Sequence, residues 1–371
     1  MSVKEGEIRQ NMQEIKQQQP KQPKYSEHHE DEKNILIDSL GRIARKLRIS
    51  VTDRCNMRCM YCMPQDKVQW FNEKDVLDYD EITRLVSILA DLGIERLRLT
   101  GGEPLLRPKL EDLIISLGKI NSIKSMSMTT NGLHLAYKAK RLRDAGLESV
   151  NISLDTFRRD RFKMITGIDG LSKVIDAIDV ADHVGLKVKI NTVVVRGWND
   201  DEIVDFANFA RDTGQIVRFI EFMPLDGSGI WQPNLVFSKK EMIKKITDNM
   251  IKIEPLDNSH INNDRNTHST DPAMLYSFVD DKGIIGFIPS ITEPFCSNCD
   301  RIRLTSDGRL LTCLFENPGY DLTSMLRTGK SEYDIKKQII EDLKKKPEGI
   351  IKIIKTNSLK PSLNLMHTIG G

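Results

Sequence analysis

Between about residues 43 and 235, hydrophobic and polar residues follow one repeating order. Apolar residues three and four positions apart predict a helix, a glycine ends it, and a short apolar or alternating stretch predicts a strand. The glycines that end these predicted helices are Gly93, Gly146, Gly185 and Gly214. With two further segments, the predicted strands cover residues 47–51, 94–100, 125–130, 147–153, 186–193 and 216–222.

Six strands that alternate with helices predict a parallel sheet with right-handed crossovers. The expected fold class is α/β, as an incomplete (βα)6 parallel barrel, and periodicity alone leaves a doubly wound open sheet as the alternative. The clearest helix begins near Asp78, where Asp78 and Glu81 fit a capping box. Its predicted apolar face comprises Ile82, Leu85, Val86, Leu89 and Leu92.

The two ends of the chain depart from this order. Residues 1–42 are polar and repetitive, so we expect a disordered N-terminal extension before a barrel at residues 43–235. Beyond residue 235 the pattern predicts a helix at 238–250, a polar loop at 258–271 and a helical region at about 322–346. Residues 236–371 are therefore expected to form a smaller C-terminal module packed on the barrel.

Composition limits the classes of partner. The formal net charge is only +2, which disfavours a general binder of nucleic acid or of membrane surfaces. No apolar run approaches the roughly 18 residues that span a bilayer, and the N-terminus lacks the apolar centre of a signal peptide. We therefore expect a soluble, cytoplasmic protein with neither a membrane nor a nucleic acid as partner.

All six cysteines fall into two triplets. The spacings are Cys-x3-Cys-x2-Cys in the first and Cys-x2-Cys-x13-Cys in the second, and neither contains a histidine or a fourth cysteine. Structural zinc usually takes four protein ligands, whereas three thiolates can hold a cubane cluster and leave one iron open to a small molecule. We predict two 4Fe–4S clusters, with a structural metal staple as the simpler alternative at each triplet. The first triplet is Cys55, Cys59 and Cys62, and the second is Cys296, Cys299 and Cys313.

Polar and glycine-rich segments collect where the predicted strands end. In parallel α/β folds, functional groups gather at the carboxyl ends of the strands, so these segments are expected to lie close together. They are the first cysteine triplet and residues 100–104, 129–132, 153–155 and 221–224.

The first triplet resembles the signature of the radical S-adenosylmethionine (SAM) superfamily. It follows the first strand, an aromatic residue (Tyr61) precedes its last cysteine, and the sequence Gly-Gly-Glu-Pro at 101–104 resembles the second motif of that superfamily. Within it, the chain is most similar to the GTP 3′,8-cyclase family over roughly residues 43–371. The resemblance is most specific at 294–305, through Cys313, and at the terminal Gly370 and Gly371.

This resemblance implies a function. A 5′-deoxyadenosyl radical from SAM would remove the C3′ hydrogen of GTP, and the substrate radical would close onto C8, giving 3′,8-cyclo-7,8-dihydro-GTP for molybdenum cofactor biosynthesis. A second cluster would bind GTP. The further partners implied are an electron donor and the next enzyme of the pathway, while the oligomeric state, a homodimer included, stays open.

The resemblance also implies site residues by position. The SAM contacts would be Tyr61, Gly102, Ser153 and Met223. The GTP contacts would be Arg48, Arg98, Thr129, Lys189, Arg301, Ile302 and Arg303, and the residues assigned to catalysis are Arg301, Arg303, Gly370 and Gly371. Guanidinium groups suit a triphosphate because they offer planar, paired donors to phosphate oxygens.

Simpler interpretations stand beside these assignments. Strand arginines and lysines are usually exposed, Met223 would ordinarily be a core residue, and terminal glycines are usually frayed. Two other functions also remain as alternatives. One is another two-cluster radical SAM enzyme, such as a peptide maturase, and the other is a zinc-stapled binding protein without catalysis.

Overall fold

The computed structural model describes residues 35–63, 68–225, 229–256, 271–315, 319–350 and 366–370. Six parallel strands form its centre, at the positions that the sequence pattern predicts, and each pairs with the next along the chain. The alternating α/β prediction is therefore confirmed. These strands are β1 (Lys46–Ser50), β2 (Arg96–Thr100), β3 (Ser125–Thr130), β4 (Ser149–Ser153), β5 (Lys187–Val194) and β6 (Ile216–Glu221).

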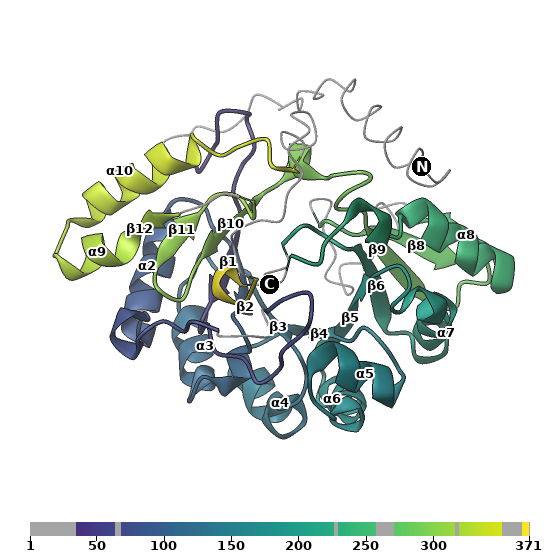
Figure 1. Ribbon diagram of the computed structural model, residues 1–371. Helices are drawn as coiled ribbons and strands as arrows, with labels where there is room; N and C mark the ends of the chain where they lie inside the picture. The colour runs from purple at the N-terminus through teal and green to yellow at the C-terminus, as the bar shows by residue number, and fades with distance from the viewer. Residues whose placement is uncertain are drawn as a thin grey trace.

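Helices cover the outer, convex face of this curved sheet (Figure 1). They are α2 (Tyr79–Asp91), α3 (Leu110–Gly118), α4 (Leu135–Asp144), α5 (Arg159–Thr166), α6 (Leu171–His183) and α7 (Ile203–Thr213). The predicted capping box opens α2: the Asp78 side chain accepts from the Glu81 amide at 2.7 Å, and the Glu81 carboxylate accepts from the Asp78 amide at 2.9 Å. No helix in the described ranges is long and apolar enough to cross a membrane.

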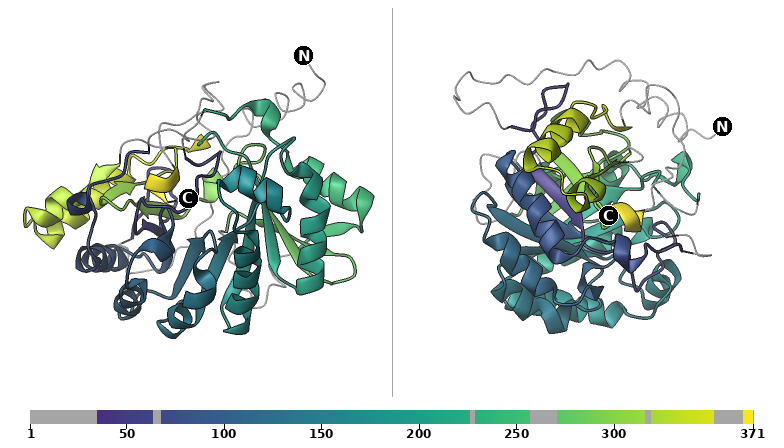
Figure 2. Two further views of the ribbon diagram at one scale, coloured as in Figure 1. Left: turned by 60° about the horizontal axis from the view of Figure 1, so that its bottom comes forward. Right: turned by 90° about the vertical axis from the view of Figure 1, so that its left-hand side faces the viewer.

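The C-terminal part contributes strands to both edges of the same sheet. The strand order is β12-β11-β10-β1-β2-β3-β4-β5-β6-β9-β8-β7, with β9 parallel to β6 and β10 parallel to β1. The expected second module therefore extends the barrel's own sheet, which stays an open arch (Figures 1 and 2). Its strands are β7 (Ile253–Pro255), β8 (Met274–Phe278), β9 (Ile284–Ile288), β10 (Arg301–Leu304), β11 (Arg309–Leu311) and β12 (Tyr320–Asp321).

The described residues of this C-terminal part contain four α-helices. They are α8 (Lys239–Asn249), α9 (Leu322–Arg327), α10 (Glu332–Leu343) and α12 (Met366–Ile369). The first three agree with the helical regions expected from the sequence. The polar loop expected at 258–271 lies outside the described residues, except for Asp271.

The chain is packed from an earlier residue than the sequence pattern predicts. Leu36 is buried, Ile37 forms a β-bridge with Ile43, and the Leu36 amide donates to the Leu92 carbonyl at 3.2 Å. Residues 35–42 are thus part of the fold, because the apolar side chain of Leu36 has a place in the core. The rest of the predicted extension, residues 1–34, lies outside the described residues.

The alternation of side chains along the strands places the site. Leu47, Ile49, Leu97 and Leu99 are buried between the sheet and the outer helices. The residues between them point to the concave face, since successive side chains of a strand face opposite sides. On β1 to β3 these concave-face residues are Lys46, Arg48, Arg96, Arg98, Ser125, Ser127 and Thr129.

Candidate active site

The first cysteine triplet occupies the loop that follows β1. Cys55, Cys59 and Cys62 are half-buried, and a tight turn brings the Cys62 amide to the Cys59 carbonyl at 2.9 Å. Burial raises the pKa of Cys55 to about 11 and that of Cys62 to about 12. The pKa of Cys59 is raised by burial and then by the charges of Cys62, Asp155 and Cys55, so the three thiols lie close enough to influence one another.

The glycine-rich segment after β2 lies directly against this cysteine loop. The Gly102 amide donates to the Thr52 carbonyl at 2.7 Å, and the Glu103 amide donates to the Arg54 carbonyl at 2.7 Å. A Cβ atom at Gly102 would lie 2.3 Å from the Arg54 carbonyl oxygen, which no side chain could tolerate without a shift of backbone. Glycine at 102 is therefore what allows the two segments to approach.

Glu103 joins this segment to the end of β3. Its buried carboxylate accepts from the Thr130 hydroxyl and the Asn131 amide, each at 2.7 Å. Burial raises the pKa of Glu103 to about 7, against the opposing effect of those hydrogen bonds. The Glu103 carboxylate therefore links the segment after β2 to the end of β3, beside the cysteine loop.

The predicted SAM residues gather around the first triplet. The Tyr61 hydroxyl donates to the carboxylate of Asp155, two residues beyond Ser153 at the end of β4. The Tyr61 ring packs edge-on against Phe222, with ring centroids 6.3 Å apart, and Met223 belongs to the same apolar cluster. Together with Gly102, the structure thus brings all four predicted residues to the carboxyl ends of the parallel strands.

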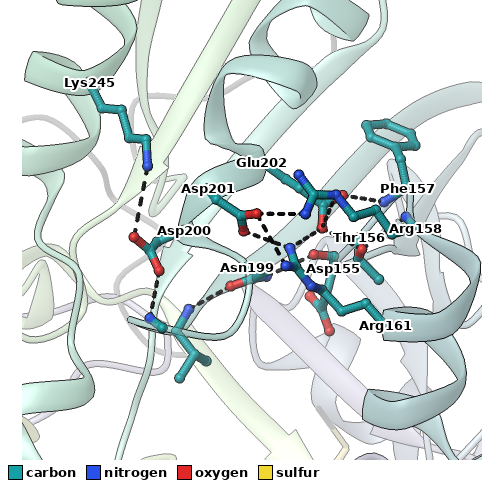
Figure 3. Close-up of polar contacts among 12 residues, drawn as sticks. Asp155, Thr156, Phe157, Arg158, Arg161, Asn199, Asp200, Asp201, Glu202 and Lys245 are labelled. Atoms are coloured by element: carbon teal, nitrogen blue, oxygen red, sulfur yellow. Dashed lines mark hydrogen bonds and ion pairs between the residues drawn. The ribbon is translucent and has the colours of Figure 1, made fainter.

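A buried polar network holds the chain segment at Asp155 and Thr156 in place (Figure 3). The Asn199 side-chain amide donates to the backbone carbonyls of Asp155 at 2.8 Å and Val193 at 2.9 Å. Glu202, fully buried, accepts from the Thr156 hydroxyl at 2.5 Å and pairs with Arg161. The sequence analysis missed Asn199 and Glu202 because polar residues between elements ordinarily belong to exposed loops.

Two cysteines of the second triplet lie next to the loop that contains Gly349. A Cβ atom at Gly349 would lie 2.8 Å from the Cys296 sulfur and 3.7 Å from the Cys313 sulfur, so both thiols face this glycine. Burial by itself would raise the pKa of Cys299, but the charges of Arg301 and Lys346 outweigh burial and lower the pKa to about 7. This environment favours a thiolate, the form that binds metal.

Two buried cations hold the loops of the second triplet. Arg42 donates to the Cys296 carbonyl at 2.9 Å and to the Pro347 carbonyl at 2.8 Å, and pairs with Asp38 at 2.6 Å. Lys346 donates to the carbonyls of Cys299 at 3.0 Å and Arg301 at 2.9 Å. The sequence pattern gives no sign of this role, because Arg42 belongs to the polar segment 1–42 that predicts a disordered extension.

Basic side chains converge in a cavity on the concave face. The register places Arg48 opposite Arg98 on one side and opposite Arg303 on the other. Burial, and then the charges of Arg303 and Arg98, lower the pKa of Arg48, so like charges crowd one another here. The lining residues are Lys46, Leu47, Arg48, Arg96, Leu97, Arg98, Ser125, Ser127, Ser149, Asn151, Lys189, Asp271, Pro272 and Arg301.

One carboxylate offsets part of this charge. Asp271 pairs with Lys46 at 2.7 Å. Burial would raise the pKa of Asp271, but the charges of Lys46, Lys189 and Arg98 hold it well below its usual range. Burial, followed by the charge of Arg218, lowers the pKa of Lys189 to about 7. The cavity thus carries excess positive charge in a desolvated setting, which is suited to an anion.

The structure brings most of the predicted GTP residues together. Arg48, Arg98, Lys189 and Arg301 line the cavity, and Arg303 lies beside Arg48 on β10. Thr129 lies on the concave face of β3, opposite Asn151 on β4. Ile302 differs, because its side chain is buried in the core on the other face of β10.

Arg218 on β6 is a buried cation that the sequence analysis missed. Its guanidinium donates to the side-chain oxygen of Asn191 at 2.9 Å and also to that of Asn151. Asn151 lines the cavity, so Arg218 adjoins it. A charged residue between apolar neighbours on both sides in a strand was the signal that could have identified Arg218.

The C-terminal tail lies against the carboxyl ends of β1 and β2. Arg303 donates to the Ile369 carbonyl at 3.3 Å and to the Gly370 carbonyl. Gly370 has a φ of +76°, and a Cβ atom there would lie 2.3 Å from the Thr100 hydroxyl. Gly370 therefore lies against the ends of β1 and β2, next to Arg303 on β10, whereas Gly371 is outside the described residues.

Most of the chain matches proteins of known type. The profile of the radical SAM superfamily matches residues 49–210, and the profile named Molybdenum Cofactor Synthesis C matches residues 215–351. The GTP 3′,8-cyclase of Thermodesulfovibrio yellowstonii is 40% identical, over 91% of this chain and 100% of that protein. The mitochondrial GTP 3′,8-cyclase of Arabidopsis thaliana is 38% identical, over 87% of this chain and 81% of that protein. The chain belongs to the GTP 3′,8-cyclase family.

Solved structures agree with the fold of this radical SAM family. Streptococcus suis SuiB bound to S-adenosylmethionine superposes with a TM-score of 0.52 and 16% identity, covering 85% of this chain and 75% of that one. At this identity the likeness concerns the fold alone. It matches the open parallel barrel described above.

Membership of the radical SAM superfamily implies SAM and a 4Fe–4S cluster, and the first triplet fits that cluster. Its three neighbouring thiols are half-buried at the strand ends. Among the described residues, no three His, Cys, Asp or Glu side chains converge tightly enough to hold a single metal ion. The thiolates of a cubane bind different irons and stand farther apart, so this spacing is compatible with a cluster.

Proposed function

We propose that this protein converts GTP to 3′,8-cyclo-7,8-dihydro-GTP in molybdenum cofactor biosynthesis. The observation that carries the proposal is the cluster of half-buried and buried cations on the concave face, of which Arg301 also donates to Cys299 of the second triplet. Relatives that match almost the whole chain are named for the same reaction. A nucleoside triphosphate provides the several negative charges that such a site needs.

The reaction balances with two electrons. The first cluster and SAM, when bound, supply the 5′-deoxyadenosyl radical that removes the C3′ hydrogen of GTP. The new C3′–C8 bond leaves an unpaired electron on the base, and one further electron and one proton complete the dihydro product. An electron donor is therefore a required partner, and the enzyme that consumes the cyclic nucleotide is the next one in the pathway.

The residues around the first triplet would hold SAM. Tyr61, fixed through its hydroxyl by Asp155, would contact the cofactor beside the cluster, as would Ser153 at the end of β4. Gly102 would present backbone without a side chain, and Met223 would supply an apolar contact. Their positions at one edge of the sheet support this assignment.

The cavity residues would hold GTP. Arg48, Arg98 and Lys189 would bind phosphate oxygens in the cavity. Thr129, outside the cavity lining, would supply a hydroxyl near the carboxyl end of β3. Arg301 lines the cavity and also donates to the Cys299 sulfur at 3.8 Å. The side chain of Ile302 faces the core, so we assign any contribution of that residue to its main chain.

The second triplet would hold a second 4Fe–4S cluster whose open iron binds GTP. Three partly buried cysteines beside cationic Arg301 and Lys346 make a suitable donor set. Arg303, together with the tail that it binds, would help to organise the bound nucleotide. We place the reaction in the cytoplasm and leave the assembly state open.

One experiment tests the proposed function. Anaerobically reconstituted protein is incubated with SAM, a reductant and GTP carrying deuterium at C3′, and the products are analysed by mass spectrometry. We expect an isomer of GTP together with 5′-deoxyadenosine that contains deuterium. Deuterium-free 5′-deoxyadenosine and unchanged GTP would contradict the proposal, and the Cys59→Ser variant provides the inactive control.

A further inference from the structure

Trp70 is a point of contact between the first cysteine loop and the C-terminal tail. The guanidinium groups of Arg54 and Arg58 both lie over its indole ring, each 5.2 Å from the ring centroid. The imidazole of His367, from the tail, meets the same indole edge-on, with centroids 5.6 Å apart and planes at 76°. Edge-to-face contacts of this kind stabilise aromatic pairs beyond simple burial.

The two arginines fix the indole to the cysteine loop. Arg58 donates to the Cys55 carbonyl at 2.8 Å and to the Met57 carbonyl at 2.9 Å. Arg54 donates to the carbonyl of Phe71, the neighbour of Trp70, at 3.1 Å. The Phe71 amide in turn donates to the Asp53 carboxylate at 2.6 Å. Contacts from Asp53, Arg54 and Arg58 thus hold Trp70 and its neighbour Phe71 against the cysteine loop.

The His367 side chain makes no hydrogen bond among the described residues. Only 1% of its surface is exposed, and neither ring nitrogen has a hydrogen-bond partner there. Burial lowers the pKa of His367 to about 4, so the ring is neutral near pH 7. Its visible role in the structure is therefore packing against Trp70.

Three residues beyond His367, the tail reaches the carboxyl ends of β1 and β2, next to Arg303 on β10. Arg303 binds the Ile369 and Gly370 carbonyls, and Gly370 packs against Thr100. The short helix α12 contains His367 and Ile369 and ends directly before Gly370. The tail is thus held at two points, one on the cysteine loop and one on a cavity-side arginine.

We propose that Trp70 and His367 are positioning residues that dock the tail, so that its terminal carbonyls stay on Arg303 during the reaction. The role in the reaction rests on the proposed function, whereas the docking contact does not. Trp70 then has a role distinct from the binding of the cluster or of SAM. It also makes the tail's position depend on an intact first cysteine loop.

A double-mutant cycle tests the docking contact. Full-length anaerobic holoenzyme is treated with a carboxypeptidase, and loss of the terminal residues is followed by intact mass. Trp70→Ala and His367→Ala should each speed this loss about three- to tenfold, the range expected for an aromatic pair. The double variant should lose the tail no faster than the faster single variant, because both changes break one contact.

Two further variants separate ring packing from other effects. His367→Phe keeps an aromatic edge against the indole and should retain most of the protection, while His183→Ala, at an exposed position at the end of α6, should behave as wild type. If the rates of tail removal multiplied in the double variant, the proposal would be overturned. It would also be overturned if carboxypeptidase removed the tail of His367→Phe as fast as that of His367→Ala.

The functional readout uses the ratio of cyclised GTP to cleaved SAM. In His367→Ala we expect unchanged iron content and unchanged SAM cleavage without GTP, but a several-fold lower ratio. A lower KM for GTP in that variant would show that the tail competes with substrate, and would overturn the positioning role. A wild-type protein without cyclase activity would refute the proposed function and leave the protease cycle to decide the docking.

Discussion

At the scale of single residues, the site depends on charges held in a desolvated place. Arg218 and Arg303 are buried and Arg48 and Arg98 half-buried near one another, and loss of solvent is the largest cause of the lowered pKa at each. Desolvation raises the free energy of the charged form, so such cations are stabilised when an anion arrives. The same feature makes individual substitutions informative about the ligand.

Arg301→Ala tests the contact between the cavity and the second triplet. A charged hydrogen bond contributes about 1.5–3 kcal/mol, so GTP should bind at least about tenfold more weakly, while SAM affinity stays unchanged. Isothermal titration with each ligand measures both values. Equal losses for the two ligands would indicate a folding defect, and exposed Arg159→Ala is the matched control.

Lys189 predicts a pH dependence of GTP binding. Its pKa of about 7 in the free protein should rise when phosphate binds, because an anion favours the charged ammonium. Binding should therefore take up a proton above about pH 7, and affinity should fall as pH rises further. Calorimetry in buffers of different ionisation enthalpy measures the uptake, which Lys189→Arg should abolish. Persistence of the same uptake in that variant would assign the proton elsewhere.

At the scale of elements, the strand ends are joined by direct backbone contacts. The segment after β2 runs along the cysteine loop through the Gly102 and Glu103 amides. Glu103 then reaches the end of β3, and Asp155 after β4 accepts from Tyr61. The first triplet is therefore shaped by three neighbouring strands as well as by its own turn.

Gly102→Ala tests this arrangement. The new Cβ atom would meet the Arg54 carbonyl oxygen at 2.3 Å and displace the cysteine loop. We expect iron to fall from about eight to about four atoms per chain, since a cubane holds four, and SAM cleavage to be lost. Gly118→Ala is the matched control, because its nearest contact would be the Met126 side chain at 3.5 Å. Full iron content in Gly102→Ala would contradict this account.

At the scale of the whole molecule, one sheet connects the two cysteine triplets. β1 leads into the first triplet, and its parallel neighbour β10 begins two residues beyond Cys299. The cavity lies across these strands, with Arg48 and Arg303 paired in register. This arrangement predicts that the two triplets have separable roles in one site.

Paired cysteine substitutions test that division. Cys59→Ser should abolish SAM cleavage, whereas Cys299→Ser should keep some reductive SAM cleavage and lose cyclisation. Each variant should retain about half the iron, because the other cubane remains. Iron analysis and product assays on both variants provide the measurement. Normal cyclisation by Cys299→Ser would remove the second triplet from substrate binding.

The amino-acid sequence alone determined the local structure and the chemical groups of this protein. The repeating order of apolar residues predicted all six central strands, and Asp78 and Glu81 predicted the start of α2, because these signals lie within a few residues of one another. The two cysteine triplets could also be recognised from the sequence as candidate cluster sites, because the spacing between these ligands is local. The family resemblance added Arg48, Arg98 and Lys189, which the fold does bring together.

Only the tertiary structure decided which distant segments meet. Periodicity does not reveal that β9 and β10 extend opposite edges of the sheet, because the pairing of strands depends on backbone groups far apart in the chain. For the same reason, Arg42 at the second triplet, Arg218 beside the cavity and His367 on Trp70 carried no recognisable signal of their partners. Burial and charge acquire their meaning at these positions from residues that the fold alone brings into contact.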